Sequence, residues 1–383
     1  MSRPRKVRLI SLLVPCIISG LSLNCVGRPA PNKQQPEQRP TIESVPSVRP
    51  RTDVQLRHAF MCGITGELEG GKYEELETHF TLFHEPGEEL EDGSRKIWLY
   101  FAAFQERTAS ASSLDDAKAF VQEAEDWAKT KSASVAARLA FCNALLGEIA
   151  KIVELARKGA LNAEDPTVNR ELADLIEECR GQIIRPREEL RRALVAEPEL
   201  YSVGVQLLDW TDAGFDQIEA MFKEACRIDP FYLPIFLRVS FWLNSKRARQ
   251  QGAPKPAGWL TKILKPMRGD PEPVRQKKIT TYAQAVGLFP GPGQLDPKDL
   301  DWPTLKVGVF QLAQTHKGSL DWPSRCLAMA YAFHDAEAAK KALELIQGNY
   351  SPEVFKNPVA FSEISHWAEE KSKPKKPNPK THP

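Results

Sequence analysis

The sequence lacks the short motifs that mark the common catalytic folds. It contains no phosphate-binding glycine loop, no nucleophile elbow and no His-Glu-x-x-His zinc motif. It also lacks the persistent alternation of apolar and polar residues that is typical of half-buried strands. Beyond residue 25 no apolar run is long enough to cross a bilayer. These absences exclude the enzyme classes that such motifs define, and they leave a chain whose patterns are helical.

Positive charge is scarce in the middle of the chain. The net charge of the 383 residues is +2, residues 1–58 contribute +7 and residues 371–383 contribute +5, so the middle carries −10. Nucleic-acid binding needs Lys and Arg clustered on the folded surface to neutralise phosphates. We therefore expect no nucleic-acid partner. The 42% of hydrophobic residues are ample for a buried core.

Cysteine and histidine do not occur at metal-site or redox-motif spacing. Glu363 and His366 give one Glu-x-x-His, which is half of a two-metal site, and no other His has a Glu three places before it. His79 and His84 lie five residues apart, off the same-face spacing of a helix. Glu85–Gly93 carries five acidic residues, but their order does not match a calcium loop, so we interpret it as a solvated loop. We predict no metal, no cofactor and no catalytic residue.

Five cysteines follow residue 25, and four of them lie within apolar helical patterns, which predicts buried thiols that act as small hydrophobes. An oxidising compartment would permit a bridge among them, but the sequence does not give its partners. The five are Cys62, Cys142, Cys179, Cys226 and Cys326.

The first 25 residues have the layout of a secretory signal. Four basic residues within the first eight precede an apolar run from Leu9 to Leu23 that Pro15 and Gly20 interrupt. The ending Ser-Leu-Asn-Cys is similar to a bacterial lipoprotein signal, whose Cys becomes the lipidated first residue; here that residue is Cys25. Ser22 and Asn24 depart from the usual pattern. We expect lipid at Cys25, and an ordinary cleaved signal or an uncleaved anchor is the alternative.

The next segment and the tail are too polar and too rich in proline to pack. Residues 26–52 contain six prolines and almost no large apolar side chains, so burial would not offset the entropy of ordering them. We predict a disordered linker there and a disordered basic tail at 371–383. Between them we expect two helical regions, 53–247 and 248–370, with a boundary in the loop Lys246–Gly258.

Apolar residues recur at helical spacing through most of this body. Leu-Asp-Trp-Pro occurs twice, at 300–303 and 320–323, and in each copy we expect the Asp side chain to cap a helix, with Pro in its first turn and a packed Trp. The predicted helices are Val54–Leu68, Lys72–Glu85, Arg95–Arg107, Leu114–Lys129, a long helix through Val135 and Val153, Thr167–Ala196 kinked at Pro186, Asp301–His316, Pro323–His334, Ala336–Gln347 and Phe361–Glu370.

The stretch from Gly214 to Leu243 reads as a helix, a turn at Asp229-Pro230 and a second helix. Phe222, Ala225 and Pro230 resemble the second half of a tetratricopeptide unit. Related segments lie 101 residues before and 120 residues after it, which are not clean multiples of that repeat period. We therefore predict an all-α fold of tetratricopeptide-like stacked helical hairpins, α-solenoid-like, with divergent repeats.

The body from about Glu67 to Ala368 also resembles a bacterial family known only as a domain of unknown function, built of tetratricopeptide-like helices. Asn244–Arg249 departs from the Pro-Arg-Trp-like stretch usual in that family, and the resemblance implies no activity. It rests on Asp92-Gly93 before Leu99 and Phe101, Trp127 before Ala136–Ala140, Asp301-Trp302 with Leu305 and Gly308, His334-Asp335 with Ala338 and Ala342, and Trp367-Ala368.

A scaffold is the functional class that these observations favour. We expect a non-catalytic protein-interaction scaffold of the cell envelope, anchored to a membrane through lipid, that binds other proteins. There are two alternatives. One is an enzyme whose site is assembled from dispersed residues, and the other is a purely structural envelope component. A secreted or periplasmic location is the alternative to membrane anchoring.

Overall fold

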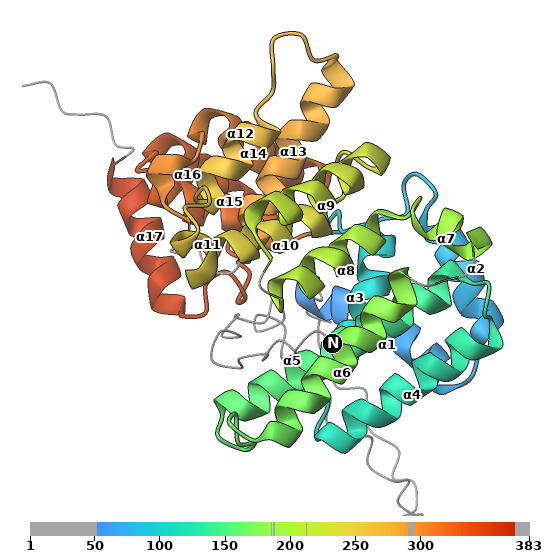
Figure 1. The fold of residues 1–383 in the computed structure, drawn as a ribbon. Coiled ribbons are helices and arrows are strands. Elements are labelled where there is room, and N and C mark those ends of the chain that lie inside the picture. Colours follow the sequence, from blue (N-terminus) through green and yellow to red (C-terminus); the bar gives the residue numbers. More distant parts are fainter. Residues whose placement is uncertain (1–51, 185, 187, 212, 290–294, 372–383) are drawn as a thin grey trace, which may run out of the picture.

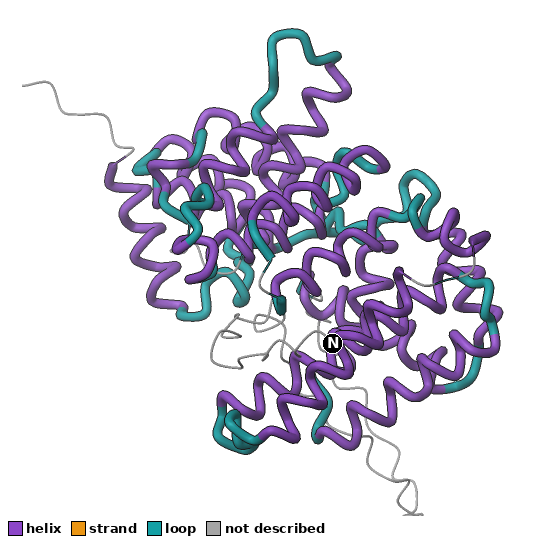
Figure 2. Tube along the Cα trace, in the orientation of Figure 1, coloured by secondary structure: helices purple, strands orange, loops and turns teal. Residues whose placement is uncertain are grey.

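The computed structural model describes residues 52–184, 186, 188–211, 213–289 and 295–371. The predicted signal with Cys25, most of the linker and most of the basic tail lie outside these residues. All the named elements of secondary structure in the described part are helices (Figure 2). One isolated β-bridge pairs Glu89 with Arg95. The all-α fold class is therefore confirmed for the part of the chain that the structure describes.

The helices follow one another with short connections. The first nine are α1 (Asp53–Glu69), α2 (Tyr73–Phe83), α3 (Lys96–Ala109), α4 (Leu114–Thr130), α5 (Val135–Arg157), α6 (Pro166–Ile184), α7 (Glu188–Leu194), α8 (Pro198–Asp209) and α9 (Phe215–Ile228). The others are α10 (Leu233–Asn244), α11 (Lys246–Gln250), α12 (Pro256–Leu264), α13 (Glu272–Leu288), the 3₁₀ turn η3 (Pro297–Asp299), α14 (Trp302–Thr315), α15 (Asp321–Ala332), α16 (Ala336–Ile346) and α17 (Pro358–Lys371).

Most of the predicted helices are confirmed, with ends that agree to within a few residues. The predicted hairpin at 214–243 is α9 followed by α10, and buried Phe222 contacts Phe236 of α10 and Trp259 of α12 at ring-centroid distances of 5.2 and 4.9 Å. The apolar patterns did not delimit α8, α12 and α13 individually. These three begin beside prolines, which suit the first turn of a helix because its N–H groups have no partner there.

Two predicted segments differ from the structure. Thr167–Ala196 is not one kinked helix: α6 ends at Ile184 and α7 begins at Glu188. Pro186 lies between them, and proline disfavours helical geometry in the residue before it. Lys246–Gly258 is not wholly a loop, because it contains α11 and the start of α12. The hydroxyl of Ser245 caps α11 by accepting from the N–H of Ala248 at 3.1 Å.

The two Leu-Asp-Trp-Pro copies do start helices with Pro in the first turn, but neither aspartate caps its helix through a bond to a backbone N–H. The Asp301 side chain instead accepts from the Thr304 hydroxyl at 3.2 Å. Asp321 is already the first residue of α15, and its carboxylate turns to other elements. Both tryptophans pack as predicted: Trp302 stacks on Phe333 at 4.6 Å, and Trp322 is buried.

Most helices pack against helices that are near them in the sequence. α1–α7 occupy one end of the body, α11–α17 the other, and α8–α10 lie between them (Figure 1). The most extensive pairings join α3 and α4 to α5, α8 to α9, α13 to α14, and α15 to α16. α10 packs against α8, α12 and α13, so it contacts helices on both sides of the boundary predicted at 247. No helix among the described residues has the length and apolarity to cross a membrane.

Two glycines allow neighbouring helices to approach closely. A Cβ on Gly147 of α5 would lie 2.4 Å from the backbone oxygen of Gln105 in α3, and one on Gly308 of α14 would lie 2.5 Å from the backbone oxygen of Ile279 in α13. Both neighbours are helix backbone, which cannot move aside as a flexible side chain can. These positions therefore require glycine for steric reasons, although glycine is otherwise unfavourable inside a helix.

We predict that Gly147→Ala and Gly308→Ala each lower the free energy of unfolding by about 1–3 kcal/mol, because a methyl group would force the paired helices apart. Gly63→Ala in α1 is the matched control: nothing lies within 4 Å of its added Cβ. That change should stabilise the protein by roughly 0.5–1 kcal/mol through helix propensity. Chemical denaturation followed by circular dichroism measures all three. Equal effects at the three positions would contradict the close-packing argument.

Candidate functional site

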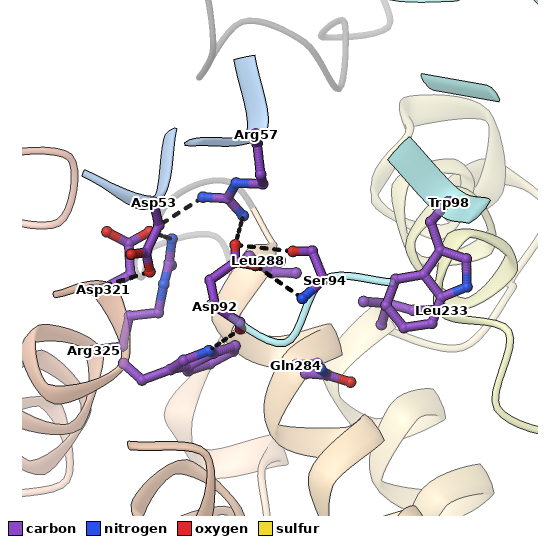
Figure 3. A pocket seen from close by; sticks show the side chains of 11 residues that line it. Asp53, Arg57, Asp92, Ser94, Trp98, Leu233, Gln284, Leu288, Asp321 and Arg325 are labelled. Carbon is purple, nitrogen blue, oxygen red and sulfur yellow. Dashed lines mark hydrogen bonds and ion pairs between the residues drawn. The ribbon is translucent and has the colours of Figure 1, made fainter. Parts of the chain in front are cut away.

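A group of charged side chains lies where the two ends of the body meet, and all of them are buried except Arg325, whose side chain is 21% exposed. Its carboxylates come from α1, from the loop before α3 and from α15, and its guanidinium groups come from α1 and α15 (Figure 3). The members are Asp53, Arg57, Asp92, Asp321 and Arg325, which we call the ionic cluster.

Asp53 caps a helix that lies more than 260 residues away in the sequence. Its carboxylate accepts from the backbone N–H groups of Leu320 and Asp321 at 3.3 and 3.4 Å, and from the hydroxyl of Ser319. These N–H groups belong to the first turn of α15, where no intrahelical acceptor exists. A carboxylate at a helix N-terminus is also favoured by the helix dipole. Asp53 therefore fixes the start of α1 to the start of α15.

Arg57 lies one turn further along α1 and pairs with two carboxylates. Its Nη1 lies 3.4 Å from Asp92 Oδ2 and its Nη2 lies 3.3 Å from Asp321 Oδ2. All three side chains are nearly buried, with at most a tenth of any side chain exposed. Charges so far from water are tolerated only when they are paired. Arg57 thus joins α1, the loop before α3 and α15 at a single point.

Asp321 continues the network toward the segment between α16 and α17. Its Oδ1 accepts from the Ser351 hydroxyl at 2.6 Å, and its Oδ2 also accepts from Arg325 at 3.4 Å. Glu353 lies beside Ser351, and its Oε1 accepts from the hydroxyl of Thr52 at 2.8 Å. The residue that caps α1 is therefore bonded to a residue 301 positions later. The two ends of the described body are held together.

The loop before α3 is fixed to the C-terminal helices by its backbone as well. Trp322 Nε1 donates to the carbonyl of Asp92 at 2.8 Å, and Gln284 donates to the carbonyl of Gly93. Gly93 has φ +79°, and a Cβ there would lie 2.4 Å from the ring of His316. This loop was predicted to be solvated. That prediction is wrong for Asp92, which is 3% exposed, because the Arg57 side chain offsets the cost of burying it.

The cluster encloses almost no empty space. The cavity among these side chains has a volume of about 10 Å³, which is room for about one water molecule. Burial and the nearby carboxylates of Asp321 and Asp92 raise the pKa of Asp53 to about 6, against the opposing effects of Ser319 and Arg57. Each charged group is engaged with another element of the same chain. The arrangement can clamp helices together, and it offers no space for a small organic substrate.

A second buried polar cluster joins four helices nearby. Glu199 of α8 accepts from the Tyr232 hydroxyl at 2.7 Å, from the Asn143 amide at 3.1 Å and from Arg238 at 3.5 Å. The same Arg238 donates to the side-chain oxygen of Gln105 in α3 at 3.2 Å. This cluster connects α3, α5 and α8 to α10, and so it joins the N-terminal end of the body to its middle helices.

The other residues that the sequence singled out have local roles. His366 lies 3.3 Å from Glu370 on its own helix and is largely exposed, whereas His79 pairs with Glu67 at 2.9 Å and His84 with Glu197 at 3.2 Å. No three His, Cys, Asp or Glu side chains in the described part of the chain are grouped to hold a metal. Cys142, Cys179 and Cys326 are buried, as their apolar patterns predict.

The basic cluster Lys246–Arg249, which the sequence placed in a loop, contributes a structural contact. Arg247 Nη1 donates to the backbone carbonyl of Asp209 at 2.7 Å and to that of Thr211. A guanidinium group at these carbonyls satisfies acceptors at the C-terminal end of α8. Arg249 likewise donates to the carbonyl of Asn244 at 3.2 Å. Arg247 and Arg249 therefore donate hydrogen bonds to backbone carbonyls at the C-terminal ends of α8 and α10.

Comparisons with known proteins add no identification. The chain matches no protein-family model, and neither the curated proteins nor the solved structures give a match.

We predict that Arg57→Met lowers the free energy of unfolding by about 3–5 kcal/mol, because it leaves the buried carboxylates of Asp92 and Asp321 without their cation. Arg192→Ala is the matched control, since the Arg192–Glu188 pair on α7 is exposed and such pairs contribute about 0.3–0.5 kcal/mol. Urea unfolding at neutral pH measures both. A loss below about 1 kcal/mol for Arg57→Met would show that the cluster does not hold the two ends together.

Two other buried carboxyl groups predict how stability depends on pH. Burial raises the pKa of Glu106 in α3 to about 7, with Arg57 opposing the shift. Burial also raises the pKa of Glu148 in α5 to about 7, with Lys118 opposing it and Glu171 adding to it. Both groups favour the protonated form in the folded state. Their contribution to stability is therefore complete below the unfolded pKa of about 4.3 and is lost as the pH rises through about 7.

We expect the folded state to lose roughly 3 kcal/mol per group between pH 4.5 and pH 8 from these two side chains. Glu148→Gln and Glu106→Gln keep the shape and remove the ionisation, so each should flatten this dependence and stabilise the protein at pH 8. Glu344→Gln, at an exposed position of α16, is the control and should leave the profile unchanged. Denaturation midpoints measured across this pH range provide the test. A destabilised Glu148→Gln at pH 8 would contradict the assignment.

Proposed function

We propose that this chain is a non-catalytic scaffold that binds other proteins at the cell envelope, where lipid on Cys25 anchors it to a membrane. The proposal also holds that the helices are divergent tetratricopeptide-like hairpins. One observation carries it: the buried charged groups of the ionic cluster are used to join the two ends of the chain around a cavity for about one water molecule. The ionic cluster thus has a structural role, and we place the proposed binding surface on the outside of the body.

The outer surface offers apolar side chains that suit protein contacts. Side chains this exposed seldom contribute to a core, and apolar or aromatic anchors supply most of the binding energy of protein interfaces. The exposed large hydrophobic residues are Leu82, Ile184, Val195, Met267, Val307, Tyr331, Leu345 and Val359. They are distributed over several helices and two connecting segments, so each is a candidate contact.

The anchoring and the scaffold role can be tested separately in the native host. Labelled fatty acid should enter the wild-type protein and the Cys16→Ser variant, but not Cys25→Ser. Cys16 lies inside the same apolar run, so it controls for a general effect of losing a cysteine there. Equal labelling of all three proteins, or labelling of none, would leave an ordinary signal peptide as the better explanation.

For the scaffold role, a photo-crosslinking amino acid is placed at each exposed apolar position in intact cells, and the products are identified by mass spectrometry. We expect one protein partner to be captured from at least one position and lost when a neighbouring exposed apolar residue is changed to Asp. Capture from the exposed position Lys158 is the control and should fail. Turnover of a small molecule by the purified chain, abolished by one His or Glu substitution, would favour the enzyme alternative.

A further inference from the structure

Two cysteines face each other across a pair of packed helices. Cys142 lies in the middle of α5 and Cys179 in the second half of α6, and these helices are neighbours along the chain and in space. Both side chains are completely buried, with exposed fractions of 0%. They are separated by 37 residues in the sequence, and no motif spacing links them. Only the packing of α5 on α6 brings them together.

Their geometry is reciprocal. The Cys142 thiol donates to the backbone carbonyl of Cys179 at 4.0 Å, and the Cys179 thiol donates to the backbone carbonyl of Cys142 at 3.8 Å. Each sulfur therefore points at the backbone of the other residue, and the two side chains share the same gap between the helices. A disulfide requires facing side chains on backbones whose Cα atoms lie about 4.4–6.8 Å apart. The crossed contacts meet the requirement for facing side chains.

The remaining cysteines of the described chain lie on other helices. Cys62 lies on the exposed face of α1 beside His58, Cys226 is partly buried in α9, and Cys326 is buried in α15. The reciprocal contact across α5 and α6 joins Cys142 to Cys179. The packing of these two helices therefore favours this one pair.

We propose that Cys142 and Cys179 form an intramolecular disulfide when the chain folds in the presence of a small-molecule disulfide such as oxidised glutathione. One cysteine thiolate attacks a sulfur of the glutathione disulfide, which gives a mixed disulfide and releases one glutathione thiolate. The second cysteine thiolate attacks the protein sulfur of the mixed disulfide, which closes the bridge and releases the second glutathione. The two cysteines lose two electrons and two protons, and the small disulfide becomes two thiols.

The bridge forms while α5 and α6 are not yet fully packed. Once the helices are packed, the hydrogen bond to Cys142 and burial raise the pKa of the Cys179 thiol. A protonated thiol is a poor nucleophile. The same packing then shields the finished bond from reducing thiols. The disulfide would close a loop that runs from Cys142 through the second part of α5, the turn and most of α6 to Cys179. Closing a loop of this length removes many conformations from the unfolded chain.

The test uses the full-length chain and needs no ligand. The protein is refolded either in a mixture of reduced and oxidised glutathione or in a strong reductant, free thiols are then alkylated under denaturing conditions, and the peptides are mapped by mass spectrometry. We expect the oxidised sample to contain a Cys142–Cys179 cross-linked peptide whose mass is lower by two hydrogen atoms. Its melting temperature should exceed that of the reduced sample by several degrees.

Substitutions give the matched controls. Cys142→Ala and Cys179→Ala should each abolish the cross-linked peptide and the difference in melting temperature, whereas Cys326→Ala, which removes an equally buried thiol, should preserve both. The peptide map of the wild-type protein decides the matter even if a variant fails to fold. Recovery of Cys142 and Cys179 as separately alkylated peptides from folded, oxidised protein would overturn the proposal. Pairing of either residue with a different cysteine would overturn it too. Neither outcome bears on lipid at Cys25 or on the scaffold role.

Discussion

The contact on which the rest of the body depends is the one between the first turn of α1 and the first turn of α15. Asp53 accepts from the N–H groups that begin α15, and Arg57 bridges Asp92 and Asp321. In a linear stack of helix pairs each pair contacts only its neighbours. Here the two ends of the sequence are joined, so displacement of one end must break buried, charged contacts. Breaking such contacts is costly because each partner would be left charged and without water.

This closure explains where the sequence could and could not predict the structure. Local features were accessible: apolar spacing gave α1, α5 and the α9–α10 hairpin, because each pattern is set by one helix face against a core. The helix break at Pro186 was also visible, but the apolar phase that continues across it favoured one helix. The local effect of the proline outweighed that phase, since the apolar faces of α6 and α7 can share phase without the helices being continuous.

The ionic cluster could not have been assembled from the sequence. Asp92 belongs to an acidic loop and Asp321 to a repeated Leu-Asp-Trp-Pro motif. Each pattern predicts the structure of its own segment and says nothing about a contact between the two. The sequence does not predict that Arg57 is buried, because a single Arg in an amphipathic helix is usually solvated. These three residues come together only in the folded chain. Asp92 and Asp321 are more than 220 residues apart in the sequence, and no local pattern predicts a contact over that separation. The same holds for Cys142 and Cys179.

The way in which charge is buried also separates two roles for the interior. Asp53, Asp92 and Asp321 are paired, so they hold α1, the loop before α3 and α15 in one arrangement. Glu106 and Glu148 are held in an apolar environment, and their pKa values near 7 make folding sensitive to proton concentration. The paired carboxylates determine which elements are in contact. Glu106 and Glu148 determine how the free energy of unfolding changes with pH. The paired carboxylates thus give the interior a fixed arrangement, which also sets the spacing of the side chains exposed on the outer surface.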